Sequence, residues 1–333
     1  METRKVQLSG GSTYIVSLPK RWAEKRGIKN GSTVNLMVDQ MGNLTISPQP
    51  IKMKESVTGR IRINGKESGD AVMRRLVGAY VSGVTGIEVY SDHKLSPHVC
   101  RTVREFTRLV MGVEIVEERS DQIRLQDLID PADFSIKEGL KRMAYITEKM
   151  VEDSMEGFKQ GDMELMDDVI LRDMEADRIC WLIHKEYNMI SQNPKVGGKN
   201  ILSSDIALNF LLASRVLERV ADHSVGIAHV IKEGGETEDE KLVEKVYSEG
   251  KNAKEIFSDS IHSLFFQDLE EADNVIDRAK ALNTRTETLL RRIYSLPSDE
   301  AVKLAFIVNS VERIAAYGAD IGKTTLNRSY STD

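Results

Sequence analysis

The chain has 333 residues, of which 41% are hydrophobic and 29% charged, and its formal net charge is −6. This composition is typical of a globular protein with sizeable cores, and a chain of this length forms two or three domains. No apolar run reaches the roughly 20 residues that span a bilayer. The first residues lack the apolar segment of a signal peptide, and two cysteines give no disulfide framework. We therefore expect a cytoplasmic protein without membrane insertion.

Charge is distributed unevenly along the chain. Residues 1–47 carry seven Lys or Arg against three acidic residues, whereas residues 133–333 carry a net charge of −11. A basic segment joined to an acidic body is the pattern of a module that faces nucleic acid. Chance clustering in a short segment would give the same count, so charge alone does not decide between the two interpretations.

Residues 1–48 predict a small all-β domain. The segments "KVQLSG" and "YIVSLP" alternate apolar and polar residues around a Gly-Gly-Ser-Thr link, and "STVNLMV" and "LTISP" do so around a second turn. Pro19 and Gly27 bound a short helix between these two hairpins. So few elements bury little core alone, and we therefore expect two copies to intertwine as a homodimer.

The string "GGSTYIVSLPKRWAEKRGIKNGSTVNLMVDQMGNLTISP" resembles the AbrB/SpoVT/MazE-like swapped-hairpin domain. The resemblance implies a dimer that presents basic residues to DNA, where cations would bind phosphates and affinity would fall steeply with salt. The DNA-binding candidates that it implies are Arg4, Lys5, Lys20 and Arg21, with the polar side chains of Thr13 and Tyr14 in addition. The alternative is a domain that only dimerises.

Residues 49–132 predict a small α/β domain. Strands are expected at "SVTGRIRI", "GIEVYS" and "VEIVEERSDQIRLQDL", the last as one strand or a hairpin, with helices at "SGDAVMRRLVGAYVSG" and "SPHVCRTVREFTRLVMG". This βαβαβ order indicates a ferredoxin-like or similar sandwich. His93, His98 and Cys100 are close in sequence, but no second cluster completes a metal site. We interpret the domain as a spacer or dimerisation module, with small-molecule sensing as an alternative.

Residues 133–333 are predicted to be helical and to contain a repeat. "DSMEGFKQGDMELMDDVILRD" from Asp153 aligns with "DSIHSLFFQDLEEADNVIDRA" from Asp259, at an offset of 106 residues. "VLERVADH" aligns with "SVERIAAY" at an offset of 94. Each copy predicts a three-helix unit, at about 135–232 and about 241–327, so the two copies predict an all-α six-helix bundle.

The motifs "LRDMEADRI", "DIALNFLLASRVLERVADHSVGIAHVI" and "NSVERIAAYGADIGKTTL" make residues 135–327 resemble the PhoU family of phosphate-uptake regulators. The resemblance implies a dimer that binds metal through Glu/Asp-x-x-x-Asp pairs and damps phosphate uptake in response to supply. An AbrB-like domain fused to a PhoU-like body is a recognisable prokaryotic architecture. Inorganic phosphate as the signal rests on this resemblance alone.

Two of the predicted helices carry acidic pairs four residues apart. By the helical step of about 100° per residue, each pair belongs to a narrow row, about 60° wide on the first helix and about 40° on the second. The rows are Asp173, Asp177, Cys180 and His184 on the first helix, and Glu218, Asp222 and His229 on the second. Buried, unpaired carboxylates are unfavourable, and a cation held between the two rows would remove that penalty.

We therefore predict the four carboxylates as metal ligands, with His184, His229 and Cys180 as additional candidates. Histidine favours iron, manganese or zinc over calcium, and a cation with an open coordination position could bind phosphate directly. The second repeat serves as an internal control. Its equivalent residues are Ala279, Asn283, Thr286 and Leu290 for the first row, and Glu312, Ala316 and Lys323 for the second. Because most of these cannot bind metal, we expect one site per chain.

The alternative interpretation is that the acidic rows are solvated faces or are neutralised by Arg178 and Arg219. At the level of function, the sequence predicts a DNA-binding regulator of phosphate uptake with a metal-binding sensing body. The second hypothesis is a scaffold that docks on a phosphate transporter ATPase or a sensor kinase, with the first domain only dimerising. An enzyme is not expected, because the chain lacks Glu-x-x-His pairs, a nucleophile–base pair and a Gly-rich phosphate loop.

Overall fold

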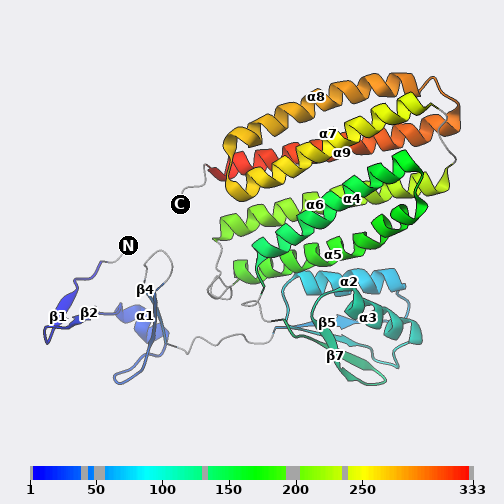
Figure 1. Cartoon of the computed structure of the whole chain (residues 1–333). Coiled ribbons are helices and arrows are strands. Elements are labelled where there is room, and N and C mark those ends of the chain that lie inside the picture. The colour runs from blue at the N-terminus through cyan, green and yellow to red at the C-terminus, as the bar shows by residue number, and fades with distance from the viewer. Residues whose placement is uncertain are drawn as a thin grey trace. The chain divides into compact units, whose positions relative to one another are not determined.

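Figure 1 shows the computed structural model of the chain. The structure describes residues 3–38, 44–48, 57–129, 134–192, 203–234 and 239–329. It divides into two compact units, Met1–Val57 and Thr58–Asp333, and the second unit holds two hydrophobic cores. None of the helices in the described ranges is long and apolar enough to cross a membrane.

The first unit consists of two antiparallel hairpins with one short helix between them. The elements are β1 (Gln7–Ser9), β2 (Thr13–Ile15), α1 (Lys20–Lys25), β3 (Asn35–Val38) and β4 (Leu44–Ser47). Strand β1 pairs with β2, and β3 pairs with β4, in two separate two-stranded sheets. This is the arrangement that the alternating pattern and the turn residues predict.

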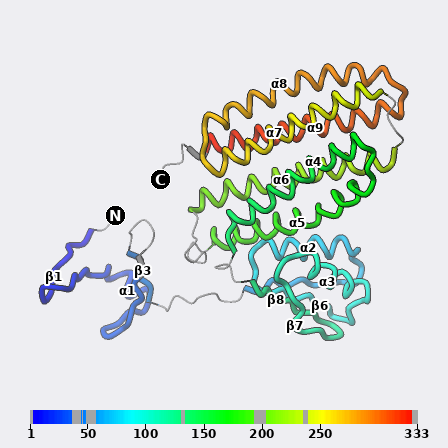
Figure 2. Tube along the Cα trace, in the orientation of Figure 1, coloured from blue at the N-terminus to red at the C-terminus, as the bar shows by residue number. Residues whose placement is uncertain are grey.

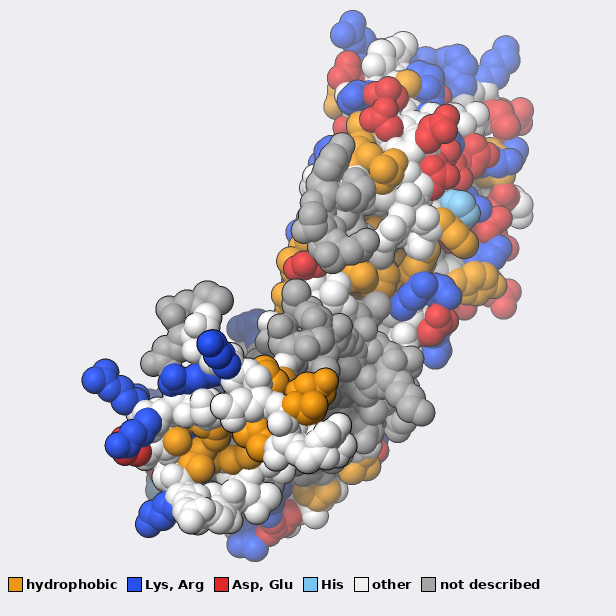
Figure 3. All heavy atoms as spheres, turned by 90° about the vertical axis from the view of Figure 1, so that its left-hand side faces the viewer, with side chains coloured by type: hydrophobic (Ala, Val, Ile, Leu, Met, Phe, Trp, Pro, Cys, Tyr) orange, Lys and Arg blue, Asp and Glu red, His pale blue; other side chains and the backbone are white. Residues whose placement is uncertain are grey.

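Apolar side chains of the first unit face solvent. None of its side chains whose burial the structure describes is buried, and Leu8, Tyr14 and Leu36 are 59%, 77% and 62% exposed. Figure 3 shows hydrophobic side chains at the surface with Lys and Arg side chains around them. Exposed apolar surface of this kind is unfavourable in water, so it fits an interface. A second copy that covers it stays a prediction.

The second unit begins with a small α/β domain. Its elements are β5 (Thr58–Arg62), α2 (Gly69–Val81), β6 (Gly86–Tyr90), α3 (Pro97–Leu109), β7 (Val113–Glu118) and β8 (Gln122–Asp127). The Oγ atoms of Ser68 and Ser96 accept hydrogen bonds from the first turns of α2 and α3, which fixes where these helices begin. The core of the domain forms between these two helices and the inward-facing residues of the sheet.

The strand order corrects one expectation. The sheet runs β5-β6-β8-β7, with β5 and β6 parallel and the other pairs antiparallel. The element order is therefore βαβαββ, whereas a ferredoxin-like domain has βαββαβ. The segment "VEIVEERSDQIRLQDL" forms a hairpin, and its second strand pairs with β6 while its first becomes the edge. The small α/β class is confirmed, but the ferredoxin-like order within it is wrong.

Six long helices complete the second unit. They are α4 (Ile136–Gln160), α5 (Met163–Gln192), α6 (Ser204–Glu233), α7 (Glu240–Phe266), α8 (Leu269–Ile293) and α9 (Ser298–Ser329). Helices α4–α6 form one three-helix layer and α7–α9 another, as the trace in Figure 2 shows. The two layers pack through α6 against α9 and α4 against α7, around one continuous core. The predicted six-helix bundle of two repeats is confirmed.

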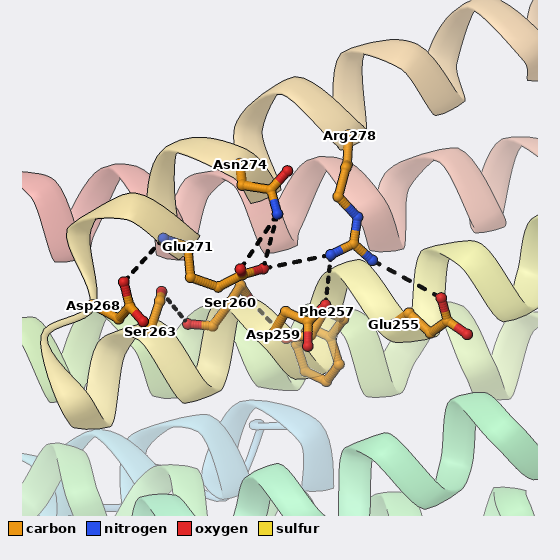
Figure 4. A network of polar contacts seen from close by, with 9 residues as sticks. All are labelled: Glu255, Phe257, Asp259, Ser260, Ser263, Asp268, Glu271, Asn274 and Arg278. Carbon is orange, nitrogen blue, oxygen red and sulfur yellow. Dashed lines mark hydrogen bonds and ion pairs between the residues drawn. The ribbon is translucent and has the colours of Figure 1, made fainter.

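The two repeats share an ion pair at equivalent positions. In the first repeat, Arg172 Nη1 of α5 lies 2.6 Å from Asp153 Oδ2 of α4. In the second, Arg278 Nη1 of α8 lies 2.6 Å from Asp259 Oδ2 of α7. Figure 4 shows this second network, in which Arg278 also reaches two glutamates. Each residue of the first ion pair lies 106 residues before its counterpart in the second ion pair. The offset found in the sequence therefore matches equivalent positions in the two three-helix layers.

The α/β domain is held against the C-terminal half of α5 by a buried polar contact. Lys185 Nζ lies 2.5 Å from Asp127 Oδ2 of β8, and their side chains are 0% and 4% exposed. The same ammonium lies 4.9 Å from the ring centroid of Tyr80 in α2. Asn188 Nδ2 of α5 donates a 2.6 Å hydrogen bond to the carbonyl oxygen of Val81. These contacts fix the α/β domain to helix α5.

Removing the cation from this contact should destabilise the fold strongly. We expect Lys185→Met to lower the free energy of unfolding by about 3–5 kcal/mol, because it leaves a buried carboxylate unpaired. Denaturant unfolding followed by far-UV circular dichroism measures the change. Lys280→Met, which removes the exposed Lys280–Asp277 pair, is the matched control and should leave stability nearly unchanged. Equal effects of the two substitutions would contradict the assignment.

Candidate metal centre

Helices α5 and α6 bring the four predicted carboxylates into one electrostatic cluster. Burial first, and then the charges of Asp173, Glu218 and Asp222, together raise the pKa of Asp177 to about 7. Burial also raises the pKa of Asp173, with Asp222 contributing, and that of Glu218, with Asp222 and Asp173 contributing. Asp173, Asp177 and Glu218 are partly buried, while Asp222 lies at the exposed edge. The acids that helical spacing grouped on each helix therefore face one another across α5 and α6.

This cluster has no cation that neutralises it within the part of the chain that the structure describes. Neither Arg178 nor Arg219 forms an ion pair with any of the four carboxylates there, so the predicted alternative of salt bridges is not found. The charge of Arg215 partly offsets the raised pKa of Asp177 and of Glu218, and that of Arg219 partly offsets the raised pKa of Glu218. The motifs in the sequence did not indicate Arg215. Its position three residues before Glu218 places the two side chains on the same face of α6, and this spacing could have indicated the interaction.

The additional ligand candidates differ in their surroundings. Cys180 is buried, and its Sγ lies 3.8 Å from the carbonyl oxygen of Ser214, while burial raises its pKa to about 11. In the metal-free protein it is therefore a neutral thiol, which would have to lose its proton to bind a metal ion. Burial and then Arg215 lower the pKa of His184, which favours the neutral imidazole that metals bind. His229 is exposed near the end of α6.

The carboxylate oxygens of the cluster are suitable ligands for a hard metal ion, but the side chains do not point to a common centre. No three His, Cys, Asp or Glu side chains among the described residues are close enough together to hold a metal ion. However, Asp173 Oδ1 is buried and has no hydrogen-bond partner, which is unfavourable unless a cation or water satisfies it. Carboxylates on facing helices are ligands that such an ion takes. Binding requires these side chains to rotate toward a common point, and the metal stays a prediction.

The second repeat uses the equivalent face as ordinary core. Ala279 and Thr286, which stand where the first repeat has Asp173 and Cys180, are buried in α8. Thr286 satisfies its hydroxyl by donating a hydrogen bond to a carbonyl oxygen of its own helix. Helix α8 therefore packs without acidic residues at these positions, so packing does not require the carboxylates that α5 carries there, although α9 keeps Glu312 at the position of Glu218.

The DNA-binding candidates lie on the surface of the first unit. Thr13 begins β2, and Lys20 and Arg21 begin α1. The side chain of Lys20 is 89% exposed and lies 3.8 Å from the carboxylate of Glu24. All of the candidates are exposed: Arg4, Lys5, Thr13, Tyr14, Lys20 and Arg21. No described contact places them on a ligand, so their role stays a prediction.

Comparison with known proteins identifies the helical body. The PhoU domain family matches residues 140–231 and 246–325, which together are more than half of the chain and fall in α4–α6 and α7–α9. The chain belongs to the PhoU family. A second family, "Antidote-toxin recognition MazE, bacterial antitoxin", matches residues 7–54, in the hairpin unit. Both resemblances that the sequence motifs suggested are confirmed.

Individual relatives agree with the PhoU assignment. A "Phosphate-specific transport system accessory protein PhoU homolog" of Clostridium acetobutylicum is 24% identical over 197 residues, or 56% of this chain and 87% of that protein. The crystal structure of PhoU from Pseudomonas aeruginosa has a TM-score of 0.53 at 17% identity and covers 59% of this chain and 96% of its own. The structure of the phosphate transport system regulatory protein PhoU from Streptococcus pneumoniae has a TM-score of 0.52 at 14% identity, covering 59% and 94%.

The two structural likenesses establish the fold alone, because their sequence identities are low. The family assignment makes the chain a member of a group of phosphate-transport regulators and not an enzyme. The α/β domain lies outside both matched families. The chain therefore has, packed on helix α5, a domain in addition to the part that the PhoU family matches.

The cluster predicts a pH dependence in the metal-free protein. The folded-state pKa of Asp177, about 7, lies above the ordinary aspartate value of 3.8, so the folded chain keeps a proton that the unfolded chain releases between these pH values. Stability should therefore fall as pH rises from about 4 to about 7. We expect Asp177→Asn to remove part of this dependence and to raise the melting temperature at pH 8 by about 2–4 °C.

Thermal unfolding in the presence of a chelator, from pH 4 to pH 8, measures this effect. Asp273→Asn, which removes an exposed acid of α8, is the matched control and should leave the pH dependence unchanged. Identical pH profiles for the parent protein and Asp177→Asn would show that the carboxylates are already paired.

Proposed function

We propose that the chain is a DNA-binding regulator of phosphate uptake, in which the PhoU body binds a metal ion and responds to phosphate. The observation that carries the proposal is the pairing of two modules in one chain. A hairpin unit with exposed basic side chains precedes a PhoU body with an uncompensated carboxylate cluster. The first module has the chemistry to bind a polyanion, and the second has the chemistry to bind a cation.

The DNA-binding half of the proposal is supported by charge and by exposure. Residues 1–47 have more than twice as many Lys and Arg as acidic residues. The basic candidates lie on the surface, next to apolar side chains that a second copy would cover. A dimer would present two sets of cations to one DNA duplex, with the phosphate contacts dominating affinity.

The metal-binding half is supported by the four carboxylates of α5 and α6. Their mutual repulsion and partial burial are relieved when a cation binds, and the second repeat shows that the fold itself does not need them. When bound, the ion would supply a fixed positive charge at this surface, and Asp173, Asp177, Glu218 and Asp222 would hold it. Iron, manganese or zinc fits better than calcium if His184 also contributes.

A scaffold that docks on a phosphate transporter ATPase or a sensor kinase is the alternative function. The exposed apolar side chains of the first unit would serve dimerisation in either case, so they do not distinguish the two. The difference lies in the basic residues, because a unit that only dimerises has no need for salt-dependent affinity for DNA.

Selection of genomic DNA fragments on the purified protein tests the DNA-binding half. We expect enrichment of promoters near phosphate-transport genes, with an affinity that falls steeply as salt rises. Arg4→Ala/Lys20→Ala/Arg21→Ala should lose the enrichment, whereas a control that removes three exposed cations of α8, Lys280→Ala/Arg285→Ala/Arg291→Ala, should keep it. Enrichment of unrelated sites would undo the phosphate assignment, and no enrichment would favour the scaffold.

Metal analysis of the purified protein tests the sensing half. We expect about one metal ion per chain, as counted from the single acidic cluster, and a loss of most of it in Asp173→Ala/Asp222→Ala. Asp273→Ala/Asp277→Ala, a pair of exposed acids in α8, is the control with the same change of charge. An unchanged metal content in the first double variant would exclude this site.

A further inference from the structure

The seam between the two repeats places two arginines at equivalent positions around one buried tyrosine. Arg219 of α6 and Arg313 of α9 correspond to each other through the offset of 94 residues. Their guanidinium carbons lie 6.0 Å and 4.8 Å from the ring centroid of Tyr317. Because α6 packs against α9, equivalent residues of the two repeats meet at this seam.

Hydrogen-bonding groups surround the two guanidinium groups. Arg313 Nη2 donates a 3.2 Å hydrogen bond to the hydroxyl of Tyr317. His223 Nδ1 lies 3.2 Å from Ser310 Oγ, and the rings of His223 and Tyr317 have centroids 5.8 Å apart. Tyr317 and Ser310 are only 7% and 1% exposed. Buried or half-buried groups that can donate or accept hydrogen bonds therefore lie beside the two arginines.

The two arginines lack the carboxylate partner that several other exposed arginines of the bundle have among the described residues. Arg285 and Arg292 of α8 pair with Glu249 and Asp239 at 2.8 Å and 2.5 Å. In contrast, within the described ranges neither Arg219 nor Arg313 forms an ion pair with an acidic side chain. Guanidinium groups without a carboxylate partner keep N–H donors available for an anion with several oxygens.

No acidic side chain within the described ranges forms an ion pair with either arginine of the seam. The Tyr317 hydroxyl is the largest contribution to the raised pKa of Arg313, and the charges of Asp320 and Glu312 contribute less. The charge of Arg219 lowers the pKa of Glu218, which belongs to the carboxylate cluster between α5 and α6, but the described side chains form no ion pair with each other. The cationic seam and the anionic cluster are thus adjacent faces of α6, with opposite charges.

We propose that Arg219 and Arg313 form a binding site for a phosphate-type oxyanion at the seam of the two repeats, and that its ligand is free inorganic phosphate. The proposal rests on the proposed function, which makes phosphate the signal, and it names where in this chain the signal binds. The tetrahedral phosphate dianion has enough oxygens to accept two hydrogen bonds from each arginine, and the Tyr317 hydroxyl could donate a further one. The site does not need a metal ion.

Titration of the full-length, chelator-treated protein with inorganic phosphate, at constant ionic strength, tests the proposal by calorimetry. We expect saturable binding that Arg219→Gln/Arg313→Gln weakens at least about tenfold, because charge-assisted hydrogen bonds are lost from both sides. Arg285→Gln/Arg292→Gln makes the same change of charge at carboxylate-paired arginines and should bind phosphate like the parent protein. Circular dichroism verifies that each variant is folded, and Arg313→Lys, which keeps the charge, serves if the double variant unfolds and should bind more weakly than the parent.

Several results would overturn the site. Equal binding by both double variants would mean unspecific attraction, and binding only in the metal-loaded protein would place phosphate on the metal ion. Tighter binding of phosphoserine than of inorganic phosphate would identify a phosphorylated partner as the source of the oxyanion. The DNA selection and the metal analysis use other residues, so failure of this site and failure of the proposed function are distinguishable.

Discussion

The arrangement of the PhoU body is best understood from one unfavourable interaction, the repulsion among four carboxylates on two packed helices. Burial and mutual charge raise the pKa of Asp177 to about 7, and the described residues include no ion pair that relieves the strain. A protein keeps such a cluster when something else stabilises it, and the equivalent face of the second repeat shows that packing does not demand it. The proposed cation would supply this stabilisation, and the sensing role proposed for this half of the bundle depends on it.

Helix α5 connects this cluster to the rest of the second unit. Its first half carries Asp173 and Asp177, and its second half holds the α/β domain through the buried Lys185–Asp127 pair. The other side of the cluster is formed by α6, which also carries Arg219 at the seam with the second repeat. A change of charge at the carboxylates thus acts on two helices that each contact another part of the molecule.

Local sequence patterns predicted those features that depend on residues near in sequence. The hairpins follow from alternation and turn residues, the repeat from its offset, and the acidic rows from the helical step, because each involves a few turns of one element. Long-range pairing could not be predicted in the same way. The insertion of β8 beside β6, the pairing of Lys185 with Asp127 and the role of Arg215 depend on which elements pack together. That the acidic row of α5 faces the acidic row of α6 was predictable only because the sequence repeat implied that these two helices pack in one three-helix unit.

The central claim is that phosphate at the PhoU body controls DNA binding by the hairpin unit. The most direct test measures the affinity of the full-length, metal-loaded protein for its selected promoter fragment at several phosphate concentrations, with total ionic strength held constant. The claim predicts that affinity changes by several-fold across the range of phosphate and that sulfate at the same ionic strength has little effect, because the two sites are coupled. An affinity that is the same at every phosphate concentration would contradict it.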